Sequence, residues 1–238
     1  AQAAGAPLMA FTAAEIDALR LSFGVAARSV LFSLPFATWI AWLLVRGRFR
    51  GRFALDAFVH LPLVLPPVVI GYLLLVLFGR RGPIGSWLYG SFGIQLAFTT
   101  AGAALATAVV SFPLMVRAIR LSLEAVDRGL EDAARTLGAG PMDRFLSITL
   151  PLMLPGILAG AVTAFAASLG EFGAVITFVS NIPGETRTLP LALYTAIQSP
   201  GGDAAAARIA ALSLALGFTG LAVSEWLARR MRRALGQA

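Results

Sequence analysis

The residues best suited to recognition chemistry stand in one polar segment, residues 130–151, which interrupts an otherwise apolar chain. Four apolar residues of this segment recur three and four positions apart, the spacing of one helix face: Leu130, Ala133, Ala134 and Leu137. Its charged residues fall on the rest of the helix: Glu131, Asp132 and Arg135. Because the apolar face is narrow and carries alanines, it suits a shallow groove. The segment therefore predicts a helix that contacts a partner protein.

Sequence signals also mark where this short helix begins and ends. Asp127 is a good amino-terminal cap, and Gly138 supplies the left-handed backbone with which many helices end. Gly140 and Pro141 then break the chain before a second helix, which runs from Pro141 into the next apolar stretch. The polar segment is therefore expected to form two helices that meet at a glycine elbow.

Several kinds of catalytic site are excluded by composition. All nineteen basic residues are arginine, so a lysine-containing phosphate loop, a Schiff base and a lysine general base cannot form. The chain has no cysteine and one histidine, which excludes thiol chemistry, disulfides and His/Cys metal clusters. We therefore expect a non-catalytic chain that cannot hydrolyse ATP and binds no metal or cofactor of its own.

The composition is that of an all-α integral membrane protein. Hydrophobic residues make up 58% of the 238 residues, charged residues only 13%, and the mean hydropathy is +0.81. Five stretches are long enough to cross the hydrocarbon core as helices: residues 22–45, 57–78, 95–119, 152–178 and 205–228. We expect these five transmembrane helices to form a single membrane domain, residues 1–238, with a polar loop at about residues 124–150.

The arginines predict how the chain is oriented. Most of them lie in alternate loops, after the first, third and fifth predicted spans. Because positively charged loops face the cytoplasm, these three regions are expected inside the cell, with the N-terminus outside and the C-terminus cytoplasmic. The polar loop of residues 124–150 then lies on the cytoplasmic side. The arginine-rich stretch after the fifth span is better explained by anionic lipids than by nucleic acid.

Polar residues in or near the fourth predicted span are candidates for a transport path. Glu171 lies between two glycines, and an ionisable side chain at such depth is a functional candidate because ionisation in lipid is unfavourable. It either hydrogen-bonds nearby groups as a structural carboxylate or repels an anion. Neutral candidates for the path or its gate are Thr163, Ser168, Thr177 and Asn181. The alternative for each of these four is a hydrogen bond to nearby backbone.

The polar loop resembles the EAA loop of the membrane subunits of ATP-binding-cassette (ABC) importers. That loop has an acidic residue, two alanines, a glycine, a hydrophobic residue and Leu-Pro. In this chain the matching residues are Glu131 or Asp132, Ala133, Ala134, Gly138, Phe145, Ile148, Leu150 and Pro151. The resemblance implies a cytoplasmic coupling helix that sits in a cleft of a separate ATPase subunit.

Further segments extend the resemblance from about residue 22 to residue 228. Four segments are similar to segments of permease subunits of the molybdate importer family: LGEFGA, SNIPGETRTLPLALYTAIQ, LPLVLPP and GPIG. The resemblance implies a type I ABC importer fold in the cytoplasmic (inner) membrane, a second copy of the chain, an ATPase dimer holding ATP and Mg, and an external oxyanion-binding protein. Sulfate and thiosulfate permeases carry similar elements, so the resemblance leaves three candidates for the transported anion: molybdate, tungstate and sulfate. The chain departs from the family pattern in two ways. Some relatives add a sixth span, and Asp132 shifts the spacing between the acidic residue and the alanines of the strict EAA form by one position.

Two questions remain open on sequence. The arginines expected on the outer face, Arg80, Arg81 and Arg187, either bind acidic residues of the docking protein or contact lipid phosphates. The competing class of protein is a secondary transporter driven by an ion gradient. Such proteins usually contain inverted repeats around a midplane ion site, whereas we find no repeat here.

Overall fold

The computed structural model describes residues 11–234, which form helices joined by turns and short loops. The membrane-length helices are α1 (Ala13–Arg46), α5 (Thr100–Glu124), α8 (Leu150–Leu169) and α11 (Asp203–Ala234). Between them lie shorter elements: α2 (Arg52–His60), η1 (Leu61–Leu63), α3 (Pro67–Phe78), α4 (Pro83–Phe92), α6 (Arg128–Thr136), α7 (Pro141–Arg144), η2 (Phe145–Thr149, a π-helical turn), α9 (Gly173–Val179) and α10 (Leu189–Gln198). The predicted all-α membrane protein is confirmed.

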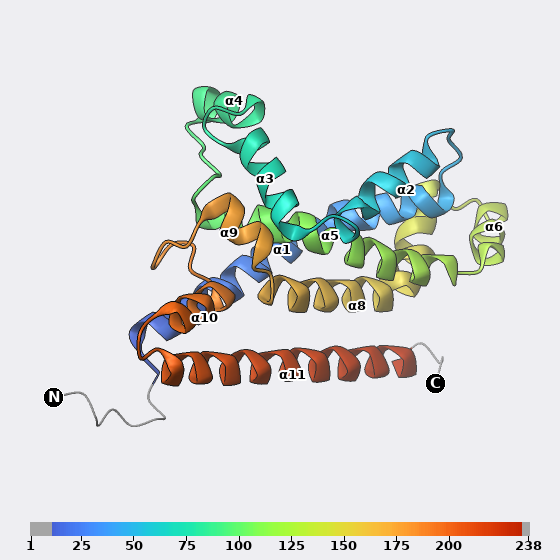
Figure 1. The fold of residues 1–238 in the computed structure, drawn as a ribbon. Helices are drawn as coiled ribbons and strands as arrows, with labels where there is room; N and C mark the ends of the chain where they lie inside the picture. The colour runs from blue at the N-terminus through green and yellow to red at the C-terminus, as the bar shows by residue number, and fades with distance from the viewer. Residues whose placement is uncertain (1–10, 235–238) are drawn as a thin grey trace.

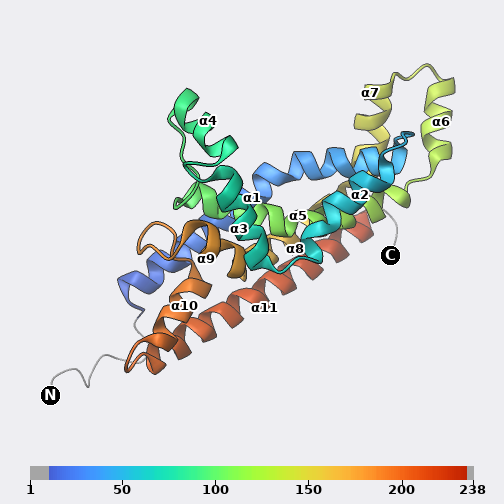
Figure 2. The same cartoon turned by 45° about the horizontal axis from the view of Figure 1, so that its top comes forward.

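Helices α1, α5 and α8 pack together as the body of the molecule, and α11 lies along α8 (Figures 1 and 2). Helix α6 lies at one end of this body, and α10 lies at the other end (Figure 1). Near α6 the core contains Leu44 of α1, Ile119 and Leu123 of α5, and Met153 of α8, all fully buried. The end of the bundle that carries α6 and the end that carries α10 therefore hold different candidate site residues.

Two glycines of α8 lie at its contact with α5. Gly156 and Gly160, one helical turn apart on α8, face α5. A Cβ atom on Gly156 would clash with the Cβ of Ser122, and one on Gly160 would lie 3.1 Å from the carbonyl oxygen of Met115. Because an added side chain would clash at Gly156 and be tight at Gly160, the small residues allow the two backbones to approach closely.

The second predicted span, residues 57–78, is not a straight helix. The segment Arg52–Leu63, which contains α2 and η1, meets α3 at a bend of 111°, and Figure 1 shows the V shape of α2 and α3. Pro62, Pro66 and Pro67 stand at the bend, where missing N–H donors and ring clashes prevent a continuous helix. Four helices of the described residues are long and apolar enough to span a membrane, or five if the bent pair counts as one.

The remaining predicted spans differ mainly at their ends. Helix α1 begins at Ala13 instead of residue 22, because Thr12 and Glu15 form a capping box there. Helix α5 begins at Thr100, since the side chain of Thr99 caps it by accepting from the Gly102 N–H. The fourth span, predicted as residues 152–178, ends at Leu169, and α9 is a separate helix. The chain ends, residues 1–10 and 235–238 of the predicted domain, lie outside the described residues.

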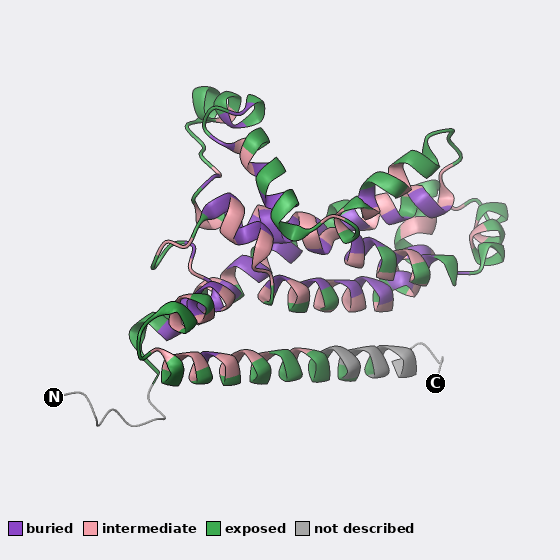
Figure 3. Cartoon of the chain, viewed as in Figure 1, coloured by how far each residue is buried: buried purple, intermediate pink, exposed green. Residues whose placement is uncertain are grey.

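Burial follows the helix contacts. Buried residues line the contacts among α1, α5 and α8, whereas α4, α6 and much of α11 are exposed (Figure 3). Helix α3 packs on α9 and α5, and the following α4 contacts mainly α3. Large apolar side chains are consequently exposed, including Phe58 at 74% and Trp87 at 59%. In a membrane protein such side chains contact lipid or another subunit.

Candidate functional site

Helix α6 stands out from the bundle in the position of a contact element (Figure 2). The carboxylate of Asp127 accepts a hydrogen bond of 2.8 Å from the Gly129 N–H, and so caps the helix as predicted. None of the residues of α6 is buried. Of the predicted apolar face, Leu130, Ala133 and Leu137 are exposed, Leu137 by 87%, and Ala134 is half-buried. This face is therefore open to a partner.

The glycine elbow has the predicted geometry. Gly138 has a φ of +87°, in the left-handed region, and the N–H of Ala139 donates to the carbonyl of Ala134 across the turn. Gly140 is extended, and α7 begins at Pro141. From there α7, the π-helical turn and α8 continue as one apolar stretch to Leu169. The elbow therefore connects α6 directly to a long helix of the body.

The two neighbouring acidic residues of α6 have different surroundings. Glu131 Oε1 accepts a hydrogen bond of 2.8 Å from the Thr149 hydroxyl and forms an ion pair of 3.1 Å with Arg46 Nη2. The Arg46 and Glu131 side chains are only 12% and 21% exposed. Asp132, in contrast, is 63% exposed and pairs at 3.4 Å with Arg135, which is equally exposed. Glu131 therefore binds α6 to its own chain, while Asp132 and Arg135 face outward.

Two further hydrogen bonds reinforce this connection. Arg46 Nη2 donates to the carbonyl of Val126, and Arg128 Nη2 donates to the carbonyl of Val45, each at 3.4 Å. The end of α1 and the start of α6 thus bind each other reciprocally. Thr149 comes from the π-helical turn, an irregularity that is frequent at functional sites. Arg46 and Thr149 were missed by the sequence analysis, because neither stands in the EAA pattern.

The candidate path residues do not converge on one site. Ser168 is buried in the body, where its hydroxyl lies 3.3 Å from the Ser29 hydroxyl and 3.4 Å from that of Ser111. Thr163 is exposed and donates to the carbonyl of Ala159, and the half-buried Thr177 donates to that of Gly173. Each hydroxyl thus has a protein partner within the chain.

Glu171 lies in the break between α8 and α9. Its Oε1 accepts a hydrogen bond of 2.8 Å from the N–H of Ala174, in the first turn of α9. Helix α9 packs against α3, where a Cβ on Gly71 would lie 2.6 Å from the carbonyl oxygen of Ala174. The carboxylate therefore orders the start of a helix that is closely packed on α3.

The three arginines that the sequence predicts on the outer face belong to two separate places. Arg80 lies over the ring of Tyr89, 4.6 Å from its centroid, and Arg81 is exposed in the same turn between α3 and α4. Arg187 lies in the loop before α10, where its Nε donates to the Asn181 side-chain oxygen at 2.8 Å. Asn181 in turn donates to the hydroxyl of Thr195 at 2.8 Å. This network holds the loop of residues 180–188 against α10.

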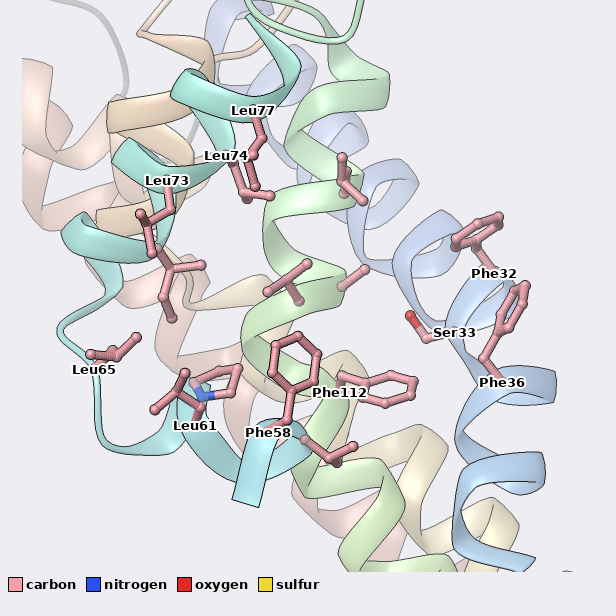
Figure 4. Close-up of a pocket in the computed structure, with 16 residues that line it drawn as sticks. Phe32, Ser33, Phe36, Phe58, Leu61, Leu65, Leu73, Leu74, Leu77 and Phe112 are labelled. Carbon is pink, nitrogen blue, oxygen red and sulfur yellow. The ribbon is translucent and has the colours of Figure 1, made fainter. Parts of the chain in front are cut away.

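An apolar hollow of about 450 Å³ lies between α1, α2, α3 and α5 (Figure 4). Phe32 and Phe36 of α1, Phe58 of α2 and Phe112 of α5 face it, together with leucines of α3. Ser33 is the one hydroxyl-bearing residue that lines it. The lining offers no polar site for an anion, and suits hydrocarbon or another apolar protein surface.

Comparison with known proteins agrees with this arrangement. Residues 33–233 match the family model of the binding-protein-dependent transport system inner membrane component. The chain is 62% identical over 229 residues to the molybdenum transport system permease protein ModB of Escherichia coli K12, covering 96% of this chain and all of that one. It is 57% identical to ModB of Haemophilus influenzae, covering 94% of this chain and 97% of that one.

A solved structure of a bacterial alginate ABC transporter, in complex with alginate pentasaccharide-bound periplasmic protein, has the same fold. The TM-score is 0.70 at 18% identity, over 92% of this chain and 78% of that one. The predicted fold, that of a type I ABC importer membrane subunit, is thus confirmed. The chain belongs to the family of binding-protein-dependent transport system inner membrane components.

Proposed function

We propose that this chain is the membrane permease subunit of an ATP-driven importer that moves molybdate, and tungstate as its analogue, across the cytoplasmic membrane. The observation that carries the proposal is the 62% identity over 96% of the chain to a molybdenum transport permease. The exposed α6 at one end of an apolar bundle supports it, since such a helix suits a subunit driven by a partner. The chain itself is a non-catalytic subunit.

Helix α6 is proposed as the coupling helix. Leu130, Ala133 and Leu137 would contact the ATPase subunit, with Asp132 and Arg135 at the edge of that contact. When ATP and Mg bind to the ATPase pair and it closes, the two coupling helices approach each other. The pore then changes from inward-open to outward-open, because ATP favours one of the two states. This role places α6 and the C-terminus in the cytoplasm and the N-terminus outside.

Two copies of the chain are proposed to enclose the path between them. The apolar hollow between α1, α2, α3 and α5 supports this arrangement, because its aromatic rims are open in the single chain: Phe32 is 63% exposed and Phe36 is 50% exposed. A second copy would cover this surface. Each copy would also bind one ATPase subunit through α6, and the oxyanion-binding protein would dock on the end that carries α10.

Reconstitution tests this function. The chain, its ATPase and its binding protein are placed in liposomes, and uptake of labelled molybdate is measured with tungstate and sulfate as competitors. We expect uptake that requires ATP and the binding protein, and that tungstate inhibits more strongly than sulfate. Equal inhibition by sulfate would instead identify a sulfate permease. Uptake driven by an ion gradient without ATP would identify a secondary transporter.

A further inference from the structure

Two adjoining hollows lie beside α7, on the side of α1 that faces α8. The first, of about 430 Å³, is lined by Trp39 and Trp42 of α1, by Arg144 of α7 and by Phe145, among others. The second, of about 540 Å³, runs between α1 and α8. Trp39, Trp42 and Phe145 line both hollows, so the two adjoin each other. Neither belongs to the exposed face of α6 or to the hollow of Figure 4.

The two hollows differ in chemistry. The second is lined by apolar side chains such as Leu150, Leu154 and Ile157, and its one hydroxyl, on Thr38, donates within its own helix to the carbonyl of Leu34 at 2.8 Å. It therefore suits hydrocarbon. Its stretch from Leu150 to Ile157 covers seven residue steps of α8, which is about 10 Å at 1.5 Å per residue.

The first hollow contains a guanidinium that lacks a partner. Arg144 Nε is buried, and within the part of the chain that the structure describes it has no hydrogen-bond partner. Arg144 also forms no ion pair with any described carboxylate. Glu131 lines the same hollow, but its Oε1 is bound by Arg46 and Thr149, and it forms no ion pair with Arg144. Because a buried donor without a partner is unfavourable, Arg144 is suited to an incoming anion.

We propose that these hollows bind one anionic phospholipid, with its phosphate at Arg144 and an acyl chain between α1 and α8. Tryptophans such as Trp39 and Trp42 are typical of the membrane–water interface, where a headgroup meets its chains. A free inorganic anion would make no use of the apolar hollow that adjoins the charged one. The lipid would contact α7 immediately after the glycine elbow, and would therefore influence the position of α6.

The lipid proposal rests on the proposed function in one respect only: that function assigns the site to the cytoplasmic leaflet. Its test uses tryptophan fluorescence of the full chain in lipid nanodiscs. Trp87 and Trp226 are replaced by Phe, which leaves Trp39 and Trp42 as the two reporters. Phosphatidylglycerol or phosphatidylcholine with brominated acyl chains is then added as a minor fraction of a phosphatidylcholine bilayer, and quenching is compared.

We expect brominated phosphatidylglycerol to quench at about fivefold lower fraction than brominated phosphatidylcholine, the factor that corresponds to roughly 1 kcal/mol for one basic residue at a membrane surface. Arg144→Gln should remove this selectivity and Arg144→Lys should retain most of it. Arg50→Gln, which removes an exposed charge from the turn between α1 and α2, should leave it unchanged.

Three results would overturn the proposal. Equal quenching by the two lipids in the parent chain would show that the hollows do not select an anionic headgroup. Selectivity that persists in Arg144→Gln would show that Arg144 does not bind the phosphate. Loss of selectivity on addition of millimolar inorganic phosphate would identify a free-anion site instead. Because the measurement needs neither ATPase nor molybdate, a failure of the proposed transport function would leave its outcome intact.

Discussion

Glu131 and Asp132 are adjacent in sequence, but successive residues point about 100° apart around a helix. This rotation turns the Glu131 carboxylate toward Arg46 and Thr149, and turns Asp132 toward solvent. Removal of Glu131 would leave the largely buried Arg46 without its counter-charge, which is more unfavourable than the loss of an exposed pair. The two carboxylates therefore have separable roles, one within the chain and one at its surface.

We accordingly expect Glu131→Ala to destabilise the purified permease by about 1.5–3 kcal/mol, the range for hydrogen bonds to charged groups. Asp132→Ala should change its stability by less than about 0.5 kcal/mol, as surface substitutions usually do. Thermal unfolding in detergent measures the first effect, and co-purification with the ATPase measures association. If Asp132→Ala destabilises the isolated permease as much as Glu131→Ala does, the assignment of separate roles is wrong.

Glu171 offers a second test at this scale. Gln keeps an oxygen that can accept from the Ala174 N–H, whereas Leu removes the acceptor from the start of α9. If the carboxylate is structural, Glu171→Gln should retain near-normal uptake and Glu171→Leu should reduce the amount of assembled protein. Uptake in vesicles, normalised to the permease in the membrane, distinguishes the two effects. A well-assembled Glu171→Gln permease without transport would instead support an electrostatic role in the path.

At the scale of elements, hydropathy predicted which segments are membrane helices but not how they bend or end. It averages over many residues, so the bend at Pro62, Pro66 and Pro67 and the break at Glu171 are both hidden within apolar windows. The elbow at Gly138 was predictable, because a helix end with a glycine is a local signal. The contact between Glu131 and Arg46 was not, since 85 residues separate them.

The elbow yields a prediction about coupling. Gly138→Val places a β-branched residue at a φ of +87°, which costs roughly 1–2 kcal/mol and favours a turn that re-aims α6. We expect more ATP hydrolysed per molybdate transported, measured in proteoliposomes. Gly140→Val is the matched control, because Gly140 has a φ of −68° and no atom within 4 Å of an added Cβ. Equal coupling ratios in Gly138→Val and the parent would exclude the elbow from the coupling path.

At the scale of the whole molecule, the chain carries surfaces that it cannot cover alone. The aromatic hollow of Figure 4 and the exposed face of α6 lie on different parts of the bundle, which suits two kinds of partner subunit. The resemblance of the sequence to ABC importer permeases predicted both kinds of partner subunit, and its composition predicted the apolar spans. It could not locate the hollow, because α1, α2, α3 and α5 are brought together only by the fold and by the bend between α2 and α3.

Arg187 stands on the end of the molecule where we propose that the binding protein docks. Arg187 lies in the ordered loop before α10, and its Nε is held by Asn181. If it meets acidic residues on the docking protein, Arg187→Glu should weaken docking and uptake most at low ionic strength, because charge complementarity across an exposed contact is screened by salt. Basal ATPase activity should remain unchanged.

Two variants separate charge from loop structure in this experiment. Arg187→Gln removes the charge and the hydrogen-bonding guanidinium without adding repulsion, so its docking defect should be smaller than that of Arg187→Glu. Arg81→Glu makes the same charge change in the exposed turn between α3 and α4, and measures how far the repulsion depends on position. Affinity is measured by titration of the binding protein at several salt concentrations. A docking affinity that responds neither to Arg187→Glu nor to salt would leave lipid contact as the role of Arg187, since lipid-facing charge does not alter a protein encounter.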